Sequence, residues 1–178
     1  SAASRSLSDL YSLPAYVSEA LTLQNKIKEI SDKYISANDF YIVGRGDNFP
    51  IALEGALKLK ELSYVHAEGM AAGELKHGTI ALIEDGTPVI LLNPPDETYV
   101  HSLTSATELR SRGARIIGIS TVNHPSYDDF IKLPCLSSKL LYPILEMIPL
   151  QMLAYFTAVG HNLDPDYPRN LAKSVTVV

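Results

Sequence analysis

The stretch "FYIVGRGDNFPIALEGALKLKELSY" (40–64) changes its hydrophobic pattern part-way along. Its first five residues are apolar and end at a glycine, which is typical of a short buried strand. From Pro50 onward the apolar residues recur at helical spacing, and the run is long enough for several helical turns. A buried strand followed closely by a helix is the repeating unit of an α/β fold.

The same unit recurs along the rest of the chain. Further strands are expected at 88–92, 115–120 and 130–134, and further helices at 14–36, 99–113 and 139–160. This alternation predicts parallel pairing with right-handed crossovers, hence an α/β fold: a three-layer α/β/α sandwich with a parallel sheet. Ligands of such sheets bind beyond the carboxyl ends of the strands, which places "GRGDNFP" (44–50) and "NPPDETY" (93–99) at the mouth of the sheet.

Length and composition indicate one globular domain. The 178 residues are 46% hydrophobic and 20% charged, without a tract of low complexity. We assign residues 1–163 to a single domain and 164–178 to a C-terminal tail. A net charge of −5 gives no electrostatic reason to expect nucleic acid or an anionic membrane, so we expect neither as a partner.

Cysteine usage and apolar segments bear on the compartment. The lone Cys135 cannot form an intramolecular disulfide, so a cytoplasmic location is expected. The most membrane-like segment, 142–160, contains Glu146, Gln151 and two prolines, which favours a buried helix instead. The lone cysteine and dispersed histidines provide no ligand set with metal spacing, so we expect no metal and no cofactor. Because the chain starts at Ser1 without a methionine, we expect a processed piece or an excised domain of a longer protein.

A narrow charged stripe runs along the helix expected at 50–64. Glu54, Lys58 and Glu61 fall within an arc of about 60°, flanked on both sides by apolar residues. This pattern favours a mostly buried helix whose ionised edge lines a cleft or an interface. A carboxylate beside a lysine in a partly dry cleft can move a proton on a substrate carbon. Alternatively, the three residues form ordinary helical ion pairs worth ~0.3–0.5 kcal/mol, which are common on helices.

Histidines and further carboxylates follow this helix. His77 in "GELKHG" (73–78) titrates near neutral pH and could open a sugar ring or shuttle a proton, although a single histidine is more often structural. We expect His66 to be structural as well. Glu68 and Glu74 are expected in loop or helix-start contexts, where they would cap backbone N–H groups.

Two long stretches carry a family resemblance. "YIVGRGDNFPIALEGALKLKELSYVHAEGMAAGELKHG" (41–78) and "PRNLAKSVTV" (168–177) closely resemble the glutamine:fructose-6-phosphate amidotransferase family, also called glucosamine-6-phosphate synthases. The match covers nearly the whole chain and resembles the second sugar isomerase (SIS) domain of that family's isomerase region. The resemblance implies conversion of fructose 6-phosphate and glutamine-derived ammonia to glucosamine 6-phosphate, the first step of hexosamine biosynthesis. It also implies a homodimer.

The resemblance implies roles for individual residues. Glu61 would shuttle a proton between C1 and C2, and Lys58 one turn earlier would support the developing oxyanion. Lys173 would form a Schiff base with open-chain fructose 6-phosphate. His77 would assist ring opening in the neighbouring subunit's site. Two residues are assigned to substrate binding, Ala172 and Glu54.

The chain lacks parts that the family has. A glutaminase domain beginning with a nucleophilic cysteine is absent, as is the first SIS half with its Ser/Thr-rich phosphate loop. At the equivalent strand end, Pro94 and Pro95 lack N–H donors, and Asp96 and Glu97 repel an anion. The stretch 44–50 lacks the third glycine of a dinucleotide fingerprint.

These departures lead to the hypothesis of a catalytic half-domain whose phosphate anchor lies on the missing half. The isolated chain is expected to be inactive, and its partners in the full-length enzyme would be the first SIS half and the glutaminase domain. Two alternatives remain open: a non-catalytic regulatory module that binds sugar phosphates, and a platform that serves only dimerisation.

Overall fold

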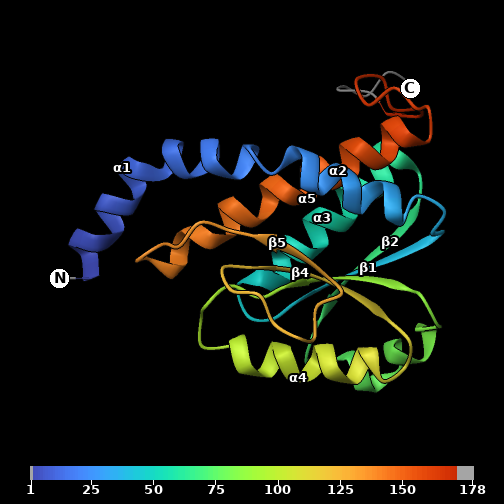
Figure 1. The fold of residues 1–178 in the computed structure, drawn as a ribbon, viewed down its shortest axis with the longest axis horizontal. Helices are drawn as coiled ribbons and strands as arrows, with labels where there is room; N and C mark the ends of the chain where they lie inside the picture. The colour runs from blue at the N-terminus through green and yellow to red at the C-terminus, as the bar shows by residue number, and fades with distance from the viewer. Residues whose placement is uncertain (1, 172–178) are drawn as a thin grey trace, which may run out of the picture.

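The computed structural model describes residues 2–171, which form a three-layer α/β/α sandwich (Figure 1). The middle layer is a five-stranded sheet in the order β2-β1-β3-β4-β5, and every neighbouring pair is parallel. The strands are β1 (Asp39–Gly44), β2 (His66–Ala71), β3 (Pro88–Leu92), β4 (Arg115–Ser120) and β5 (Asp129–Lys132). The predicted α/β class and parallel pairing are therefore confirmed.

Helices cover both faces of the sheet, as Figure 1 shows. One face carries α1 (Ala2–Leu21), α2 (Gln24–Lys33), α3 (Asn48–Ser63) and α5 (Tyr142–Gly160), with the short η3 (Lys139–Leu141) before α5. The other face carries α4 (Tyr99–Arg110) with the short helices η1 (Leu75–His77) and η2 (Thr79–Leu82). The helices predicted at 50–64, 99–113 and 139–160 are thus present within a few residues of their predicted bounds.

Alternation along the strands explains why their sequences read as unbroken apolar runs. In β1, Phe40 and Ile42 belong to the buried cluster beneath α2, α3 and α5, whereas Tyr41 and Val43 belong to the cluster beneath α4. Because successive side chains point to opposite faces, a strand covered by helices on both faces must be apolar at every position.

The strand β2 was not predicted. Its sequence, "HAEGMA", is poor in β-branched residues, and Ala, Gly and Glu are disfavoured in strands. All six of its residues nevertheless pair with β1 at the edge of the sheet. A Cβ atom on Gly69 would lie 2.7 Å from the backbone of Leu53, so α3 packs directly on this strand. Glu68, expected in a loop, instead lies in this strand.

The predicted helix 14–36 is wrong as a single element. The structure has α1 and α2 there, separated at Thr22 and Leu23. The hydroxyl of Thr22 donates a hydrogen bond to the carbonyl oxygen of Glu19 at 2.7 Å. The backbone N–H groups of Thr22 and Leu23 likewise bond to carbonyl oxygens three residues earlier, those of Glu19 and Ala20, so the i→i−4 pattern of the α-helix is interrupted there.

The helix α5 is the most apolar of the α-helices in residues 2–171. The segment Lys139–Gly160 is long and apolar enough to cross a membrane by length and composition, and 44% of its apolar 18-residue window is buried inside the protein. Its inner face, including Leu145, Leu150 and Leu153, lies in the main core cluster beside α3 and α2. The interpretation of 142–160 as a buried helix is confirmed for this face.

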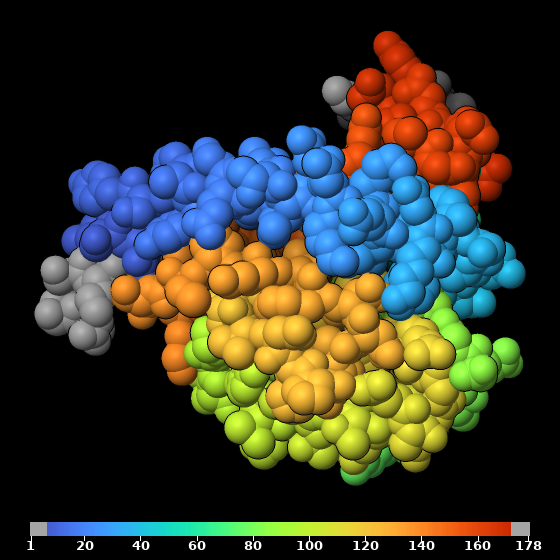
Figure 2. All heavy atoms as spheres, in the orientation of Figure 1, coloured from blue at the N-terminus to red at the C-terminus, as the bar shows by residue number. Residues whose placement is uncertain are grey.

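The topology separates the two ends of α3. After β1 the chain forms β2 on one side of that strand and then β3 on its other side. The direction of the strand order therefore reverses, and the switch point of the sheet lies between β1 and β3. Helix α3 starts at this carboxyl edge and returns to the amino edge, where β2 begins. Figure 2 shows the C-terminal segment, up to residue 171, projecting at one end of the molecule beyond α2.

Candidate active site

The charged stripe of α3 forms a tight ionic group. Lys58 Nζ lies 2.6 Å from Glu61 Oε2 and 3.6 Å from Glu54 Oε1, with the Lys58 and Glu61 side chains 27% and 29% exposed. The hydrogen bond to Glu61 is the largest cause of a pKa of Lys58 that is raised above its ordinary value. Lys58 is therefore held as a cation beside a carboxylate.

Lys58 and Glu61, but not Glu54, line a cleft whose opposite wall is the C-terminal segment. We call it the α3 cleft: about 590 Å³, lined by Leu57, Lys58, Lys60, Glu61, Tyr64, Arg169, Asn170 and Leu171. An adjoining cleft of about 920 Å³ shares Lys58, Glu61 and Leu171 and reaches along residues 165–168. The predicted cleft beside the ionised edge is present, and it brings α3 together with residues that lie more than 100 positions later in the sequence.

The prediction of a mostly buried α3 holds for one side of the helix only. Its buried residues are Asn48, Ala52, Gly55, Ala56, Leu59 and Ser63. Leu53 and Leu57 are each 48% exposed, so the apolar flank of the charged stripe faces outward in this chain.

The predicted Schiff-base residue Lys173 and its neighbour Ala172 lie outside the described residues. Leu171, the last described residue, lines both clefts together with Lys58 and Glu61.

His77 is not brought to the α3 cleft. It ends η1, which follows the carboxyl end of β2, whereas Glu61 lies near the amino edge of the sheet. The His77 side chain is 72% exposed, and its Nδ1 lies 2.7 Å from Glu74 Oε2. His66 likewise pairs locally, with its Nδ1 2.8 Å from Asp39 Oδ1.

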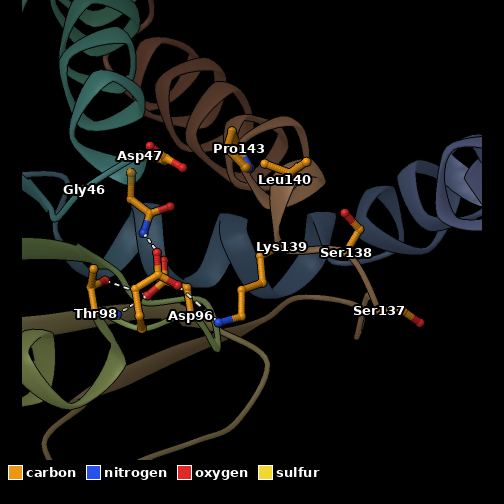
Figure 3. A pocket seen from close by; sticks show the side chains of 11 residues that line it. Gly46, Asp47, Asp96, Thr98, Ser137, Ser138, Lys139, Leu140 and Pro143 are labelled. Atoms are coloured by element: carbon orange, nitrogen blue, oxygen red, sulfur yellow. Dashed lines mark hydrogen bonds and ion pairs between the residues drawn. The ribbon is translucent and has the colours of Figure 1, made fainter. Parts of the chain in front are cut away.

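A second hollow lies where ligands usually bind parallel sheets. This sheet mouth, of about 440 Å³, is lined by Gly46, Asp47, Asn48, Asp96, Glu97, Thr98, Ser137, Ser138, Lys139, Leu140 and Pro143 (Figure 3). The stretches 44–50 and 93–99 do meet there, as predicted. Within residues 2–171, however, no three His, Cys, Asp or Glu residues are grouped so as to hold a metal ion.

Several polar groups of the sheet mouth already pair with one another. Asp96 accepts hydrogen bonds from the backbone N–H and hydroxyl of Thr98 at 2.7 and 2.6 Å (Figure 3). Its other oxygen accepts one from Asn48 Nδ2 at 2.9 Å. Lys139 Nζ lies 3.1 Å from Glu97 Oε2, and this pairing contributes to a lowered pKa of Glu97, together with a hydrogen bond to the Glu97 backbone that is the larger cause. The hollow is acidic and unsuited to an anion.

A buried carboxyl group on α5 was missed as a feature of interest. Glu146 is 0% exposed, and neither of its side-chain oxygens has a hydrogen-bond partner. Burial, with a smaller contribution from Asp96, raises the pKa of Glu146 to about 8. Sequence reasoning had used this residue only as an argument against a membrane span, because its position on an apolar helix gives no sign of its neighbours.

Similarity to known proteins shows the family of this chain. The model of the SIS domain family matches residues 33–158, more than half of the chain. The chain belongs to the SIS domain family. Its relatives include glutamine–fructose-6-phosphate aminotransferases (isomerizing) of Pyrococcus horikoshii, 52% identical, and Methanothermobacter thermautotrophicus, 45% identical, each over 93% of this chain. The chain spans only 28% and 29% of those proteins.

Solved structures of SIS domain proteins agree. The C-terminal domain of glucosamine-fructose-6-phosphate aminotransferase from Francisella tularensis matches 89% of this chain, and 45% of that chain, with 35% identity and a TM-score of 0.83. Tagatose-6-phosphate ketose/aldose isomerase from Escherichia coli covers 85% of this chain, and 44% of its own, with a TM-score of 0.74, but at 22% identity it supports the fold alone. The resemblance stated from the sequence is confirmed.

Proposed function

We propose that this chain is the second SIS domain of a glutamine–fructose-6-phosphate aminotransferase and carries the isomerising groups of that enzyme. The observation that carries the proposal is the α3 cleft. A Lys58–Glu61 pair 2.6 Å apart faces the segment 169–171, which leads in sequence directly to Ala172 and Lys173. A base, a fixed cation and an approaching amine are the groups that ketose amination and isomerisation need.

The chemistry starts at the C2 carbonyl of open-chain fructose 6-phosphate. The neutral amine of Lys173 adds to C2 and water leaves, which gives a Schiff base. Ammonia then displaces the lysine, which regenerates the free amine. Glu61 takes a proton from C1 and returns it to C2, which yields glucosamine 6-phosphate. The sum of these steps is one sugar phosphate and one ammonia consumed, one amino sugar phosphate and one water formed.

The two lysines have different tasks in this scheme. A nucleophilic amine must be neutral, and the raised pKa of Lys58 makes that residue unsuited to the task. A lysine that stays protonated can instead stabilise the negative charge that develops on the sugar during proton transfer. We assign Glu54, 3.6 Å from Lys58, to binding of the same substrate, although its side chain does not line the α3 cleft.

We further propose that the active unit is a homodimer. His77 lies at the exposed end of η1 and is separated from Glu61 of its own chain by the length of β2. A ring-opening histidine in this position serves a site only when a second copy brings it there. The half-exposed Leu53 and Leu57 beside the cleft suit contact with the first SIS half, which would also supply the phosphate anchor absent from the acidic sheet mouth.

The remaining parts of the proposal follow from the same scheme. The isolated chain is inactive because both the phosphate anchor and the glutaminase domain lie on other parts of the enzyme. The location is cytoplasmic, where fructose 6-phosphate is made and where the free, exposed Cys135 stays reduced.

The experiment that tests the proposal traps the Schiff base in the full-length enzyme. Incubation with fructose 6-phosphate and cyanoborohydride, without glutamine, is expected to leave a reduced sugar adduct on the peptide that contains Lys173, identified by mass spectrometry. Lys173→Arg should abolish the adduct, whereas Lys28→Arg, on the exposed face of α2, should keep it. Substrate binding without any adduct would instead favour the regulatory module.

A further inference from the structure

The residue that ends α3 has an unusual backbone conformation. Tyr64 has φ 59° and ψ 13°, in the left-handed region. The other non-glycine residues with positive φ among residues 2–171 are Asn162 and Asn170, and asparagine tolerates this region far better than a bulky aromatic residue. A strained conformation persists where the surrounding structure holds it, and such positions concentrate at functional sites.

The side chain of Tyr64 makes two separate contacts with the C-terminal segment. Its hydroxyl oxygen accepts a hydrogen bond from the backbone N–H of Arg169 at 2.7 Å. The guanidinium of Arg169 lies over its ring, 4.1 Å from the centroid, within the range of a cation–π interaction. These contacts join residues 105 positions apart in sequence.

The contacts lie at the point where the chain enters the α3 cleft. Upstream, the segment is fixed by His161, whose Nε2 lies 2.8 Å from the carbonyl oxygen of Ile35. Downstream, the left-handed Asn170 turns the chain, and Leu171 lines the cleft with Lys58 and Glu61. Tyr64 is itself one turn beyond Glu61, so it ties the direction of the C-terminal segment to the helix that carries the charged stripe.

We propose that Tyr64 is a positioning residue that docks the C-terminal segment over the Lys58–Glu61 face and thereby sets the approach of Lys173 to the substrate carbonyl. The inference rests on the proposed function for the role of Lys173, but the docking itself does not. Tyr64 does not react. By docking the segment, Tyr64 increases the fraction of time that the Lys173 amine is close enough to the substrate carbonyl to react. This increase raises the rate of Schiff-base formation.

The docking is tested first on this chain by hydrogen exchange. Tyr64→Phe keeps the ring and loses the hydroxyl; Tyr64→Asn also loses the ring but tolerates the left-handed backbone. Exchange at the Arg169 amide is expected to rise by about fivefold to tenfold in Tyr64→Phe, and further in Tyr64→Asn. Tyr11→Asn, at an 85% exposed position on α1, is the control that should leave it unchanged. Unchanged exchange in Tyr64→Asn, or equal loosening of α3 itself, overturns the docking.

The positioning is tested next in the full-length enzyme. Tyr64→Asn is expected to lower kcat and the rate of reductive trapping on Lys173 by about tenfold or more, with the KM for fructose 6-phosphate changed far less. Tyr64→Phe should fall between this variant and the wild type. Trapping at the wild-type rate in Tyr64→Asn, or a change in KM alone, overturns the positioning role. If the wild type forms no Lys173 adduct while exchange responds as expected, the proposed function fails and the docking stands.

Discussion

The sheet mouth and the α3 cleft are opposite ends of one helix with opposite chemical character. At the mouth, Asp96 is saturated by Thr98 and Asn48, and the nearby lysine is paired with Glu97. In the cleft, the Lys58–Glu61 pair opens onto a space of about 590 Å³. Asn48 and Glu61 are 13 positions apart on α3, a rise of about 20 Å along the helix.

The general rule for ligand sites in α/β folds predicts the position of a hollow in this chain, but not the position of the proposed catalytic groups. The rule places ligands at the carboxyl edge, and a hollow is present there. Its acidic, self-paired side chains leave little to bind an anionic sugar. The groups that we propose to react lie near the amino edge, where the end of α3 and the returning C-terminal segment form a cleft that the sheet alone does not provide.

The largest difference between the two regions should appear in turnover of the full-length enzyme. Glu61→Gln removes the base but keeps the size of the side chain, and we expect synthesis of glucosamine 6-phosphate from fructose 6-phosphate and glutamine to fall by ~10²–10⁴-fold. Asp96→Asn, the same change of charge at the sheet mouth, should leave turnover nearly unchanged.

Thermal unfolding of both variants shows whether either change acts through stability. Undiminished synthesis by a folded Glu61→Gln enzyme would remove the catalytic role of the cleft and favour a chain that serves only dimerisation. A loss in Asp96→Asn without loss of stability would move the site to the mouth.

The second expected difference is in the pH dependence of stability, and it concerns Glu146. Burial, and to a smaller extent the charge of Asp96 at the mouth, disfavours ionisation of this carboxyl group. Its pKa is raised from 4.5 to about 8, so between these values the folded chain binds a proton that the unfolded chain has released. The free energy of unfolding should therefore decrease as pH rises through this window, by up to ~1.4 kcal/mol per pH unit. Glu146→Gln, which stays neutral, removes this decrease.

Urea unfolding at several values between pH 5 and pH 8 measures this linkage. The variant should gain stability over the wild type steadily as pH rises, and Glu29→Gln, a 72% exposed carboxylate on α2, should show no such gain. Parallel pH profiles for wild type and Glu146→Gln would mean that this carboxyl group is ionised in the folded chain.

Local sequence patterns predicted the layers and part of the site. The runs at 40–44 and 115–120 are apolar because the strands are covered on both faces, so burial is visible in the sequence itself. The Lys58–Glu61 pair is an i,i+3 contact and follows from helical spacing alone.

Other features depend on partners far along the chain. The strand β2 forms because β1 offers it a full ladder of partners, not because "HAEGMA" favours strands. The contact of Tyr64 with Arg169 joins an unusual helix end to a segment without regular structure. No periodicity or motif marks either residue, so sequence reasoning did not find this wall of the cleft.

A smaller effect tests whether His77 serves the cleft of its own chain or of a second copy. Full-length enzymes carrying Glu61→Gln or His77→Asn are each expected to be impaired. After subunit exchange between them, turnover should recover to about a quarter of wild type, because half of the dimers are mixed and one of their two sites keeps both residues.

Absence of recovery separates the possibilities. If His77 acted on the Glu61 of its own chain, every site in a mixed dimer would still lack one residue, and no turnover would return. Size-exclusion chromatography of tagged and untagged chains confirms that exchange has taken place, so a negative result places His77 outside the proposed shared site.

The smallest signal is expected from the isolated chain titrated with glucosamine 6-phosphate in a calorimeter at low ionic strength. The sheet mouth carries Asp47, Asp96 and Glu97 with a single lysine, so we expect no phosphate site there, and we propose that the α3 cleft binds only the sugar end. Binding weaker than millimolar is therefore expected, and addition of the first SIS half should strengthen it.

Micromolar binding by this chain would instead mean that the phosphate is held within it. Asp96→Asn would then decide where: tighter binding would place the phosphate at the mouth, and unchanged binding would place it beside Lys58, Lys60 and Arg169 in the cleft.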